Sequence, residues 1–142
     1  MKRTLNSIKI EFPALAENEA LARSCICAFA AQADPTAGEL ADIRCAVSEA
    51  VTNAVVHAYG AAGGRVYISA EILEGRKVAV RVRDRGRGIP DIALAMTPLY
   101  TTDSNGERSG MGFAIMKSFT DILKVTSKEG KGTSVLMIKA LK

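Results

Sequence analysis

Several features that define common protein classes are scarce in this sequence of 142 residues. It has three cysteines, Cys25, Cys27 and Cys45, no C-x-x-C pair, and one histidine, His57. Because a structural zinc ion needs about four such ligands at short spacings, the sequence argues against a zinc site. An odd number of cysteines in apolar helical segments predicts buried, reduced thiols in a cytosolic protein.

Long apolar runs are also missing. No segment approaches the ~20 apolar residues that a membrane-spanning helix needs. Residues 1–8 lack the apolar centre of a signal peptide. We therefore expect a cytoplasmic protein that makes no contact with a membrane.

Aromatic residues make up only 5% of the chain, and its net charge of +4 comes from lysines and arginines spread along the sequence. Proteins that bind nucleic acids usually combine a basic block with stacking aromatic side chains or a recognisable motif. Since neither occurs, we expect no direct contact with nucleic acid. A basic surface here is suited instead to an acidic protein partner or to the phosphates of a nucleotide.

The sequence does contain regular alternation of apolar and polar residues, which is typical of strands with one buried face. With 48% hydrophobic residues, the chain is able to form a proper core, and we expect a single domain over residues 1–142. The alternating stretches predict one strand and two hairpins: 5–12, then 66–72 with 77–83, then 122–127 with 133–140.

Helical segments with apolar arcs lie between these strands. Asn18 is a candidate cap for a helix over residues 19–33. Thr36 and Glu39 have capping-box spacing at the start of a second helix, which glycines end after residue 59, and a short third helix covers 112–120. The predicted class is α/β (α+β), a two-layer sandwich in which helices cover one face of a mixed, mostly antiparallel sheet.

The segment from Ser48 to Tyr59 places a carboxylate and a carboxamide on the second helix at i, i+4. Glu49 and Asn53 therefore lie one turn apart at the edge of its apolar arc. A glutamate accepts a proton, and an asparagine carbonyl suits a hard cation such as Mg²⁺. Taken alone, the same spacing also fits a solvated helix edge.

Two glycine motifs follow. Asp84, Gly86 and Gly88 form D-x-G-x-G after a strand; the carboxylate is suited to an exocyclic amine such as that of adenine, and glycine allows close approach of a flat ligand. An ordinary turn has the same composition.

Gly110 and Gly112 precede a helix, whose free N–H groups favour an anion. Neither Walker A nor Rossmann spacing is present.

The order and separation of these motifs resemble the GHKL ATPase superfamily, whose ATP-binding domain is the Bergerat fold. Ser-Glu-Ala-Val-Thr-Asn-Ala, Gly-Ile-Pro-Asp, Thr-Thr and Glu-Arg-Ser-Gly-Met-Gly-Phe are similar to stretches of the anti-sigma-factor serine kinases of Gram-positive bacteria. The segments at 17–23 and 31–36 are similar to the sporulation members, the anti-sigma-F factors. The resemblance covers nearly the whole chain.

The resemblance implies ATP/ADP and Mg²⁺ as cofactors. It implies that Asp84 bonds the adenine amine beside Gly86 and Gly88, that Thr133 supports this contact, and that Asn53 coordinates Mg²⁺. Glu49 is then the catalytic residue, orienting and deprotonating the attacking hydroxyl. The remaining nucleotide contacts are assigned to a lid within residues 96–108 and the loop after it: Thr101, Thr102, Arg108, Gly110, Met111 and Gly112. A simple surface loop is the alternative for the lid.

The resemblance also implies protein partners. Arg23 matches an arginine that contacts both a sigma factor and an anti-anti-sigma protein, and Arg108 either pairs with a partner or stabilises phosphate charge. The implied protein is a homodimer that binds and inhibits sporulation sigma factor F. As an ATP/Mg²⁺-dependent serine kinase, it also phosphorylates the anti-anti-sigma factor.

Other functions remain open at this stage. A related general-stress anti-sigma kinase would need a similar scaffold, and a nucleotide-dependent sigma-binding module without transfer activity would need only part of the site. A histidine-kinase catalytic domain normally accompanies dimerisation helices with a phosphoacceptor histidine. A gyrase-like or chaperone ATPase needs further domains. The eukaryotic kinase motifs are absent from the sequence.

Overall fold

Five strands form one sheet in the computed structural model, which describes residues 3–59, 63–89 and 112–142. The spatial order is β1-β2-β3-β5-β4, and each of the four described pairings is antiparallel. The sequence predicted a mixed, mostly antiparallel sheet. No parallel pairing occurs among the described strands. Their bounds are β1 Thr4–Pro13, β2 Arg65–Leu73, β3 Lys77–Asp84, β4 Ile122–Lys128 and β5 Gly132–Ala140.

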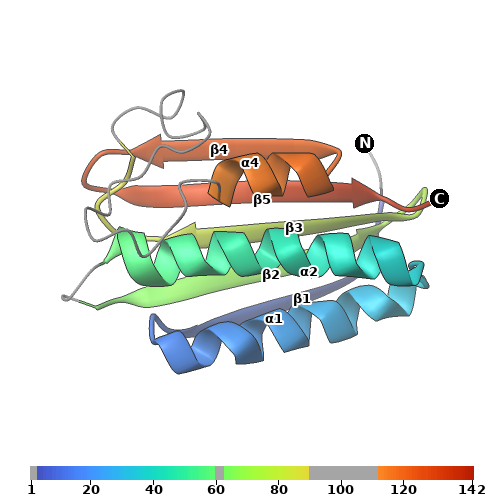
Figure 1. Ribbon diagram of the computed structural model, residues 1–142, viewed down its shortest axis with the longest axis horizontal. Helices are drawn as coiled ribbons and strands as arrows, with labels where there is room; N and C mark the ends of the chain where they lie inside the picture. The colour runs from blue at the N-terminus through green and yellow to red at the C-terminus, as the bar shows by residue number, and fades with distance from the viewer. Residues whose placement is uncertain (1–2, 60–62, 90–111) are drawn as a thin grey trace.

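Helices cover one face of this sheet (Figure 1). Helix α1 spans Ala16–Ala30 and continues as a short 3-10 turn, η1, over Ala31–Ala33; α2 spans Ala37–Thr52; α4 spans Gly112–Phe119. Helix α2 lies in the middle of the layer and packs against both α1 and α4. This arrangement confirms the predicted two-layer α+β sandwich. None of the described helices is long and apolar enough to span a membrane.

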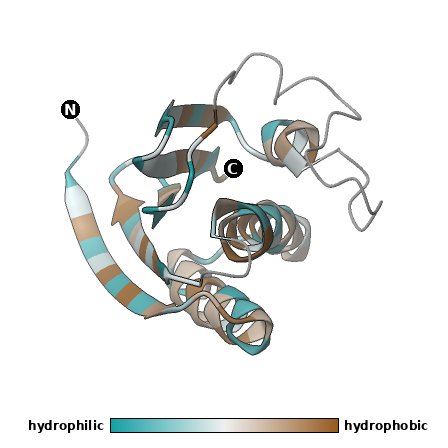
Figure 2. Ribbon diagram, turned by 90° about the vertical axis from the view of Figure 1, so that its left-hand side faces the viewer, coloured by the Kyte–Doolittle hydropathy of each residue, from teal (hydrophilic) through white to brown (hydrophobic). Residues whose placement is uncertain are grey.

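The core lies between the two layers because every second strand residue points toward the helices. On β2 the inward residues from Val66 to Ile72 are buried, with their outward neighbours more exposed. Figure 2 shows the same alternation as hydrophobic and hydrophilic bands along the strands. The helices contribute the other half of the core, including the fully buried Ile26 and Val51.

The opposite sheet face is polar at its β2–β3 part, as expected for a solvated strand face. Arg81 donates to Ser134 Oγ on β5 at 3.1 Å. The guanidinium groups of Arg83 and Arg85 lie over the ring of Tyr67, at 5.8 and 5.0 Å from its centroid. These contacts are cation–π interactions on an exposed surface, where each contributes little to stability.

Two helix N-caps were predicted from the sequence, and one of them occurs in the structure. The capping box of α2 is confirmed: the Thr36 hydroxyl accepts from the Glu39 N–H at 3.1 Å, and the Glu39 carboxylate accepts from the Thr36 N–H at 2.9 Å. The Asn18 cap was wrong. Helix α1 begins earlier, after Leu15, and the Asn18 amide donates to the Pro13 carbonyl at 3.0 Å, which ties the helix to the end of β1.

The end of the second helix also differs from the expectation of a plain α-helix. At Asn53 the α-helical turns widen into a π-helix, η2, over Asn53–Ala58. Single π turns inside helices occur often at functional sites. The widening begins at the residue that the sequence marks as a metal ligand.

The thiols are free, as predicted, but they are less buried than expected. Cys25 and Cys27 are half-buried, and Cys45 on α2 is exposed. Burial raises the pKa of the Cys27 thiol, and the charges of Arg44 and Arg23 partly oppose this rise. The expectation of buried thiols failed because apolar neighbours in sequence do not fix which side of a helix faces the sheet.

Candidate nucleotide site

The predicted catalytic, metal and nucleotide-binding residues that the structure describes gather at one end of the sheet. The end of α2 with η2, the end of β3, the start of β5 and the start of α4 all lie there (Figure 1). A backbone hydrogen bond of 2.9 Å from the Arg87 N–H to the Ala58 carbonyl joins η2 to the loop after β3. The sequence motifs are therefore neighbours in space, although more than 20 residues separate each from the next along the chain.

Glu49 and Asn53 lie on the last α-helical turn of α2 and the first residue of η2. Both are half-buried, between the apolar side of the helix and solvent. Oxygen atoms of this kind, one from a carboxylate and one from a carboxamide, are ligands that Mg²⁺ accepts. The two side chains fit a role at a metal–phosphate centre.

Asp84 ends β3 and is held by backbone donors. Its Oδ1 accepts from the Gly86 N–H at 2.9 Å, and the Thr133 N–H on the paired strand is a second backbone donor to the carboxylate. Burial raises the pKa of Asp84, and these two hydrogen bonds lower it in part. A half-buried carboxylate held in one orientation at a strand end is suited to read a hydrogen-bond donor on a ligand.

Thr133 belongs to a small hydroxyl cluster beside Asp84. Its Oγ1 lies 2.8 Å from the Ser127 Oγ, which also contacts the Gly132 carbonyl at 3.0 Å. The Ile89 N–H donates to the same Ser127 oxygen at 2.7 Å. Ser127 was not among the predicted residues. Its position opposite Thr133 in the β4–β5 register is the signal that points to it.

The glycines after Asp84 have a different explanation from the one expected. A Cβ on Gly86 would lie 2.2 Å from the Ala58 carbonyl oxygen, and one on Gly88, where φ is +76°, would lie 2.3 Å from the Lys128 carbonyl oxygen. A side chain at either position would therefore collide with the protein's own backbone, which by itself requires glycine there. Both glycines let the loop pack between η2 and the β4–β5 turn.

Tyr59 is a second residue that sequence reasoning missed. Its hydroxyl accepts from the Arg85 N–H at 2.7 Å and donates to the Arg65 carbonyl at 2.5 Å. Its ring covers Gly64, where a Cβ would meet the ring at 2.2 Å. The residue after η2 therefore fixes the backbone next to Asp84. A tyrosine immediately followed by a glycine-rich turn is the only sequence signal for this role.

Arg23 lies apart from this end of the sheet, in the middle of α1. It is half-buried, and one guanidinium nitrogen contacts the Ser48 Oγ on α2 at 3.4 Å. Gly112 is buried at the first position of α4. The other predicted residues lie outside the described part of the chain, as does the whole of the expected lid: Thr101, Thr102, Arg108, Gly110 and Met111.

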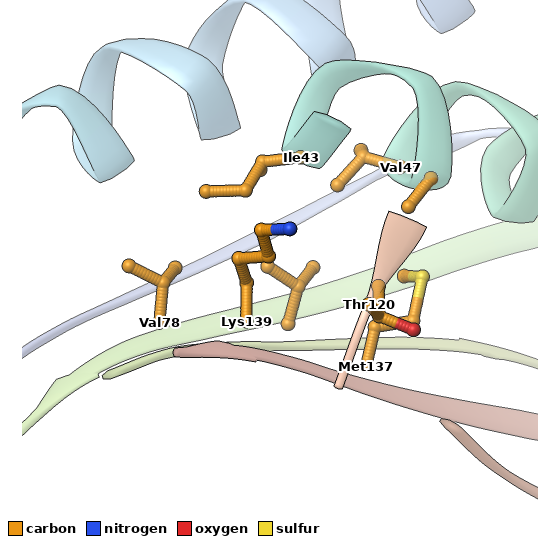
Figure 3. Close-up of a pocket in the computed structure, with 8 residues that line it drawn as sticks. Ile43, Val47, Val78, Thr120, Met137 and Lys139 are labelled. Carbon is orange, nitrogen blue, oxygen red and sulfur yellow. The ribbon is translucent and has the colours of Figure 1, made fainter. Parts of the chain in front are cut away.

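A cavity elsewhere in the molecule does not belong to this site. It has a volume of about 10 Å³, enough for one water molecule. It lies between α2 and the sheet, with Lys139 at its side (Figure 3), and the Lys139 ammonium pairs with Asp42 at 3.0 Å. The lining residues are Ile43, Ala46, Val47, Val78, Val80, Thr120, Met137 and Lys139.

The donor set fits a Mg²⁺–nucleotide better than a metal ion alone. Among the described residues, no group of three or more His, Cys, Asp or Glu side chains is arranged to hold a metal. Mg²⁺ characteristically takes one or two protein oxygens and completes its shell with phosphates and water. The Asn53 carbonyl matches that limited supply, and the Asp84 carboxylate is a separate hydrogen-bond acceptor that suits a base.

Comparison with known proteins identifies the class. A family model described as the histidine kinase-like ATPase domain matches residues 12–139. The chain belongs to this family. The RsbU and RsbW domains of a Mycobacterium tuberculosis protein share the fold, with a TM-score of 0.71 and 20% identity over 96% of this chain and 32% of that chain. A histidine kinase domain from Erythrobacter litoralis has a TM-score of 0.56 at 24% identity, over 87% of this chain and 61% of that chain.

Within the family, the chain's relatives are anti-sigma F factors. The anti-sigma F factor of Pasteuria penetrans is 53% identical over 99% of this chain and 93% of that protein. The one from Clostridium acetobutylicum is 48% identical over 94% of this chain and 93% of that protein. These matches confirm the family resemblance that the motifs indicated.

Proposed function

We propose that this chain is an anti-sigma factor that inhibits a sigma factor of the F type and also acts as an ATP/Mg²⁺-dependent protein serine kinase. Its protein substrate is an anti-anti-sigma factor. The relatives at about half identity support the anti-sigma part of this proposal. The histidine kinase-like ATPase family supports nucleotide binding.

One observation carries the kinase part of the proposal. Glu49 on α2 and Asn53 at the start of η2 stand one turn apart, and the hydrogen bond between the Arg87 N–H and the Ala58 carbonyl joins η2 to the loop after Asp84. We assign adenine recognition to Asp84, metal binding to Asn53 and proton acceptance to Glu49, and the hydrogen bond joins the two backbone segments that carry them. Such a set supports phosphoryl transfer, which depends on positioning and on neutralising charge.

Bound Mg²⁺-ATP supplies the phosphoryl group and the counter-charge. Asp84 accepts the hydrogen bond from the adenine amine, and Thr133 with Ser127 supports that contact. Asn53 provides an oxygen ligand to the metal. The N–H groups near Gly110, Met111 and Gly112 hold phosphate oxygens, and Thr101, Thr102 and Arg108 contact the nucleotide from the lid.

Glu49 acts on the acceptor. Its carboxylate orients the serine hydroxyl and takes its proton while the serine oxygen bonds to the γ-phosphorus. The bond between that phosphorus and the bridging oxygen of ADP breaks in the same step. The products are phosphoserine, ADP and a protonated Glu49, which releases its proton to solvent.

Partner binding is assigned to α1 and the lid. Arg23 contacts the sigma factor and the anti-anti-sigma factor, and Arg108 contributes to the same surface or to phosphate binding. We further propose a homodimer that acts in the cytoplasm. Nucleotide binding links the two activities, because a ligand that prefers one lid conformation shifts the affinity for a partner.

A phosphotransfer assay tests the proposal. The full chain is mixed with Mg²⁺-ATP and the anti-anti-sigma protein of the same genome, and phosphoserine is sought by mass spectrometry. We expect phosphoserine with the wild type and at least a hundredfold less with Glu49→Gln, which keeps the shape of the side chain. The Gln variant should still bind ATP.

The sigma-binding function is tested separately, by titrating the chain with the sigma factor in the presence of ATP. If sigma binding persists while a panel of anti-anti-sigma proteins stays unmodified, the chain is a sigma-binding module and the kinase part is overturned. If neither partner binds, the anti-sigma part fails as well.

A further inference from the structure

Two pairs of polar side chains interlock across the interface of α1 and α2. Each pair is spaced i, i+4 on its own helix: Glu19 and Arg23 on α1, Ser48 and Thr52 on α2. We propose that Glu19, with Ser48 and Thr52, forms a clasp that positions Asn53 and Glu49 for Mg²⁺-ATP. The proposal rests on the nucleotide function given above, and it assigns positioning roles to residues outside the predicted site.

The contacts of the clasp are specific. The Thr52 hydroxyl donates to the Glu19 Oε1 at 2.6 Å, and the Ser48 hydroxyl donates to the same oxygen at 3.3 Å. Arg23 donates to the Ser48 Oγ at 3.4 Å, so Ser48 relays between the guanidinium and the carboxylate. All three hydrogen bonds are part-buried. A charged acceptor strengthens such bonds, most of all the short one from Thr52.

The clasp contacts α2 at two positions, Ser48 and Thr52. Ser48 immediately precedes Glu49, and Thr52 immediately precedes Asn53. Since neighbouring residues on an α-helix point about 100° apart, the hydroxyls face α1 while the next residues face a different side. Holding Ser48 and Thr52 against α1 therefore sets the rotation of α2 about its axis, and this rotation sets where the two site residues point.

A contact from outside the helix is needed at this point because the α-helix becomes a π-helix there. Thr52 is the last residue of α2, and the π-helix starts at Asn53. A helix that widens has one more residue in its turn, so the position of the first widened residue depends on a fixed point before it. The 2.6 Å bond from Thr52 to Glu19 provides that point.

The hydroxyls would otherwise disturb the helix. Serine and threonine inside a helix commonly donate to the carbonyl four residues earlier, which bends the helix. In this structure both hydroxyls donate to Glu19 instead. The carboxylate thus gives each hydroxyl a partner away from its own backbone, directly before the two site residues.

The test compares Thr52→Val, which keeps the shape and loses the hydroxyl, with Thr52→Ser, which keeps the hydroxyl. ATP affinity of the full chain is measured with Mg²⁺ and with a chelator, at a temperature where all variants are folded by circular dichroism. The readout is the ratio of the two dissociation constants, which isolates the metal-dependent part. Thr126→Val, on β4 at the far edge of the sheet, is the matched control.

We expect Thr52→Val to reduce the Mg²⁺-dependent gain in affinity about tenfold, equal to ~1.4 kcal/mol, whereas Thr52→Ser and Thr126→Val keep it. Glu19→Ala should have a similar effect, and the double variant Glu19→Ala/Thr52→Val should be little worse than either single one, because both remove the same bond. Equal ratios for Thr52→Val and wild type, or additive effects in the double variant, would overturn the clasp.

The wild type separates this proposal from the proposed function. If it gains affinity from Mg²⁺ but transfers no phosphate, the kinase part fails, and the clasp is still decided by the variant ratios. If the wild type binds ATP equally well with and without Mg²⁺, Asn53 has no metal to hold, and the clasp is overturned together with that assignment.

Discussion

The side-chain hydroxyl of Tyr59 lies 2.7 Å from the backbone nitrogen of Arg85, across 26 residues of sequence. The bond joins the end of the π-helix to the residue directly after Asp84. Movement of one segment is therefore transmitted to the other, and the carboxylate that we propose for adenine binding depends on a residue that follows the helix that we propose for metal binding.

Removing this hydroxyl should harm nucleotide binding more than stability. In Tyr59→Phe the Arg85 N–H and the Arg65 carbonyl lose their shared partner, which costs about 1 kcal/mol because both groups are near solvent. We expect several-fold weaker ATP binding, measured by titration with a fluorescent ATP analogue.

Tyr67→Phe is the matched control for that change. It removes a phenol hydroxyl from a ring whose described contacts are the stacked guanidinium groups of Arg83 and Arg85. Equal losses of affinity in the two Phe variants would show that the Tyr59 bridge does not hold the loop.

Gly86→Ala should be strongly destabilising. The added Cβ would lie 2.2 Å from the Ala58 carbonyl oxygen, which belongs to rigid backbone, so η2 or the loop must shift. We expect a loss of about 2 kcal/mol or more in the free energy of unfolding, measured by urea denaturation.

Gly38→Ala provides the opposite control in the same chain. Gly38 lies in the first turn of α2 with no atom within 4 Å of its added Cβ. Replacing a helical glycine at such a position should stabilise the protein by about 0.5–1 kcal/mol. A Gly86→Ala variant as stable as wild type would contradict the close packing described for the loop.

Asp84→Asn should lower the ATP affinity without lowering the stability of the fold at neutral pH. Burial raises the pKa of Asp84 in the folded chain, so the folded state holds this proton more tightly than the unfolded state. The stability of the wild type therefore falls as pH rises from the ordinary aspartate pKa, about 3.9, through the higher folded pKa. The asparagine variant lacks this fall.

Thermal unfolding at pH 7 and below about pH 4 checks the sign. At pH 7 the melting temperature of Asp84→Asn should equal or exceed that of wild type, and its advantage should shrink in acid. ATP affinity should nevertheless decrease, because a carboxamide is a poorer acceptor for the adenine amine. Unchanged affinity would remove Asp84 from the nucleotide site.

Arg23→Ala should weaken binding of the sigma factor and of the anti-anti-sigma protein, by about tenfold, and leave the ATP affinity within twofold of wild type. Alanine is preferable to glutamate here, because a new carboxylate would face Ser48, which already serves Glu19. The measurement is a partner titration by calorimetry. Loss of folding instead of binding would give the residue a structural role.

The elements that sequence predicted correctly depend on short-range chemistry. The Thr36–Glu39 capping box and the β2–β3 hairpin through Glu74-Gly75 rely on contacts between residues a few positions apart. Glu49, Asn53 and Asp84 were identified because their motifs match a family in order and spacing. Local rules were therefore sufficient for the fold class, and motif order was sufficient to name the residues of the proposed site.

Features that were missed depend on contacts that are distant in sequence. The glycines after Tyr59 do not show that its hydroxyl will bridge β2 and the residue after β3, and Glu19 meets Thr52 only because α1 and α2 pack together. The Asn18 cap failed for a local reason, since the helix already begins after Leu15 and the Asn18 amide donates to the Pro13 carbonyl five residues earlier. The sequence predicted that position 86 requires glycine. The group that a side chain there would meet, the Ala58 carbonyl, lies in another element and could not be predicted.

The π-helix over Asn53–Ala58 also limits how this protein can vary in length. Deleting one residue there would rewind the turn to an α-helix, and everything after it would rotate by about 100° and retreat by about 1.5 Å relative to Glu49. The Ala58 carbonyl and the Tyr59 hydroxyl would then face away from the loop of Asp84. The number of residues between Glu49 and Tyr59 thus fixes the relative positions of the two ends of the site. Homologous chains should therefore accept substitutions in this interval far more readily than insertions or deletions.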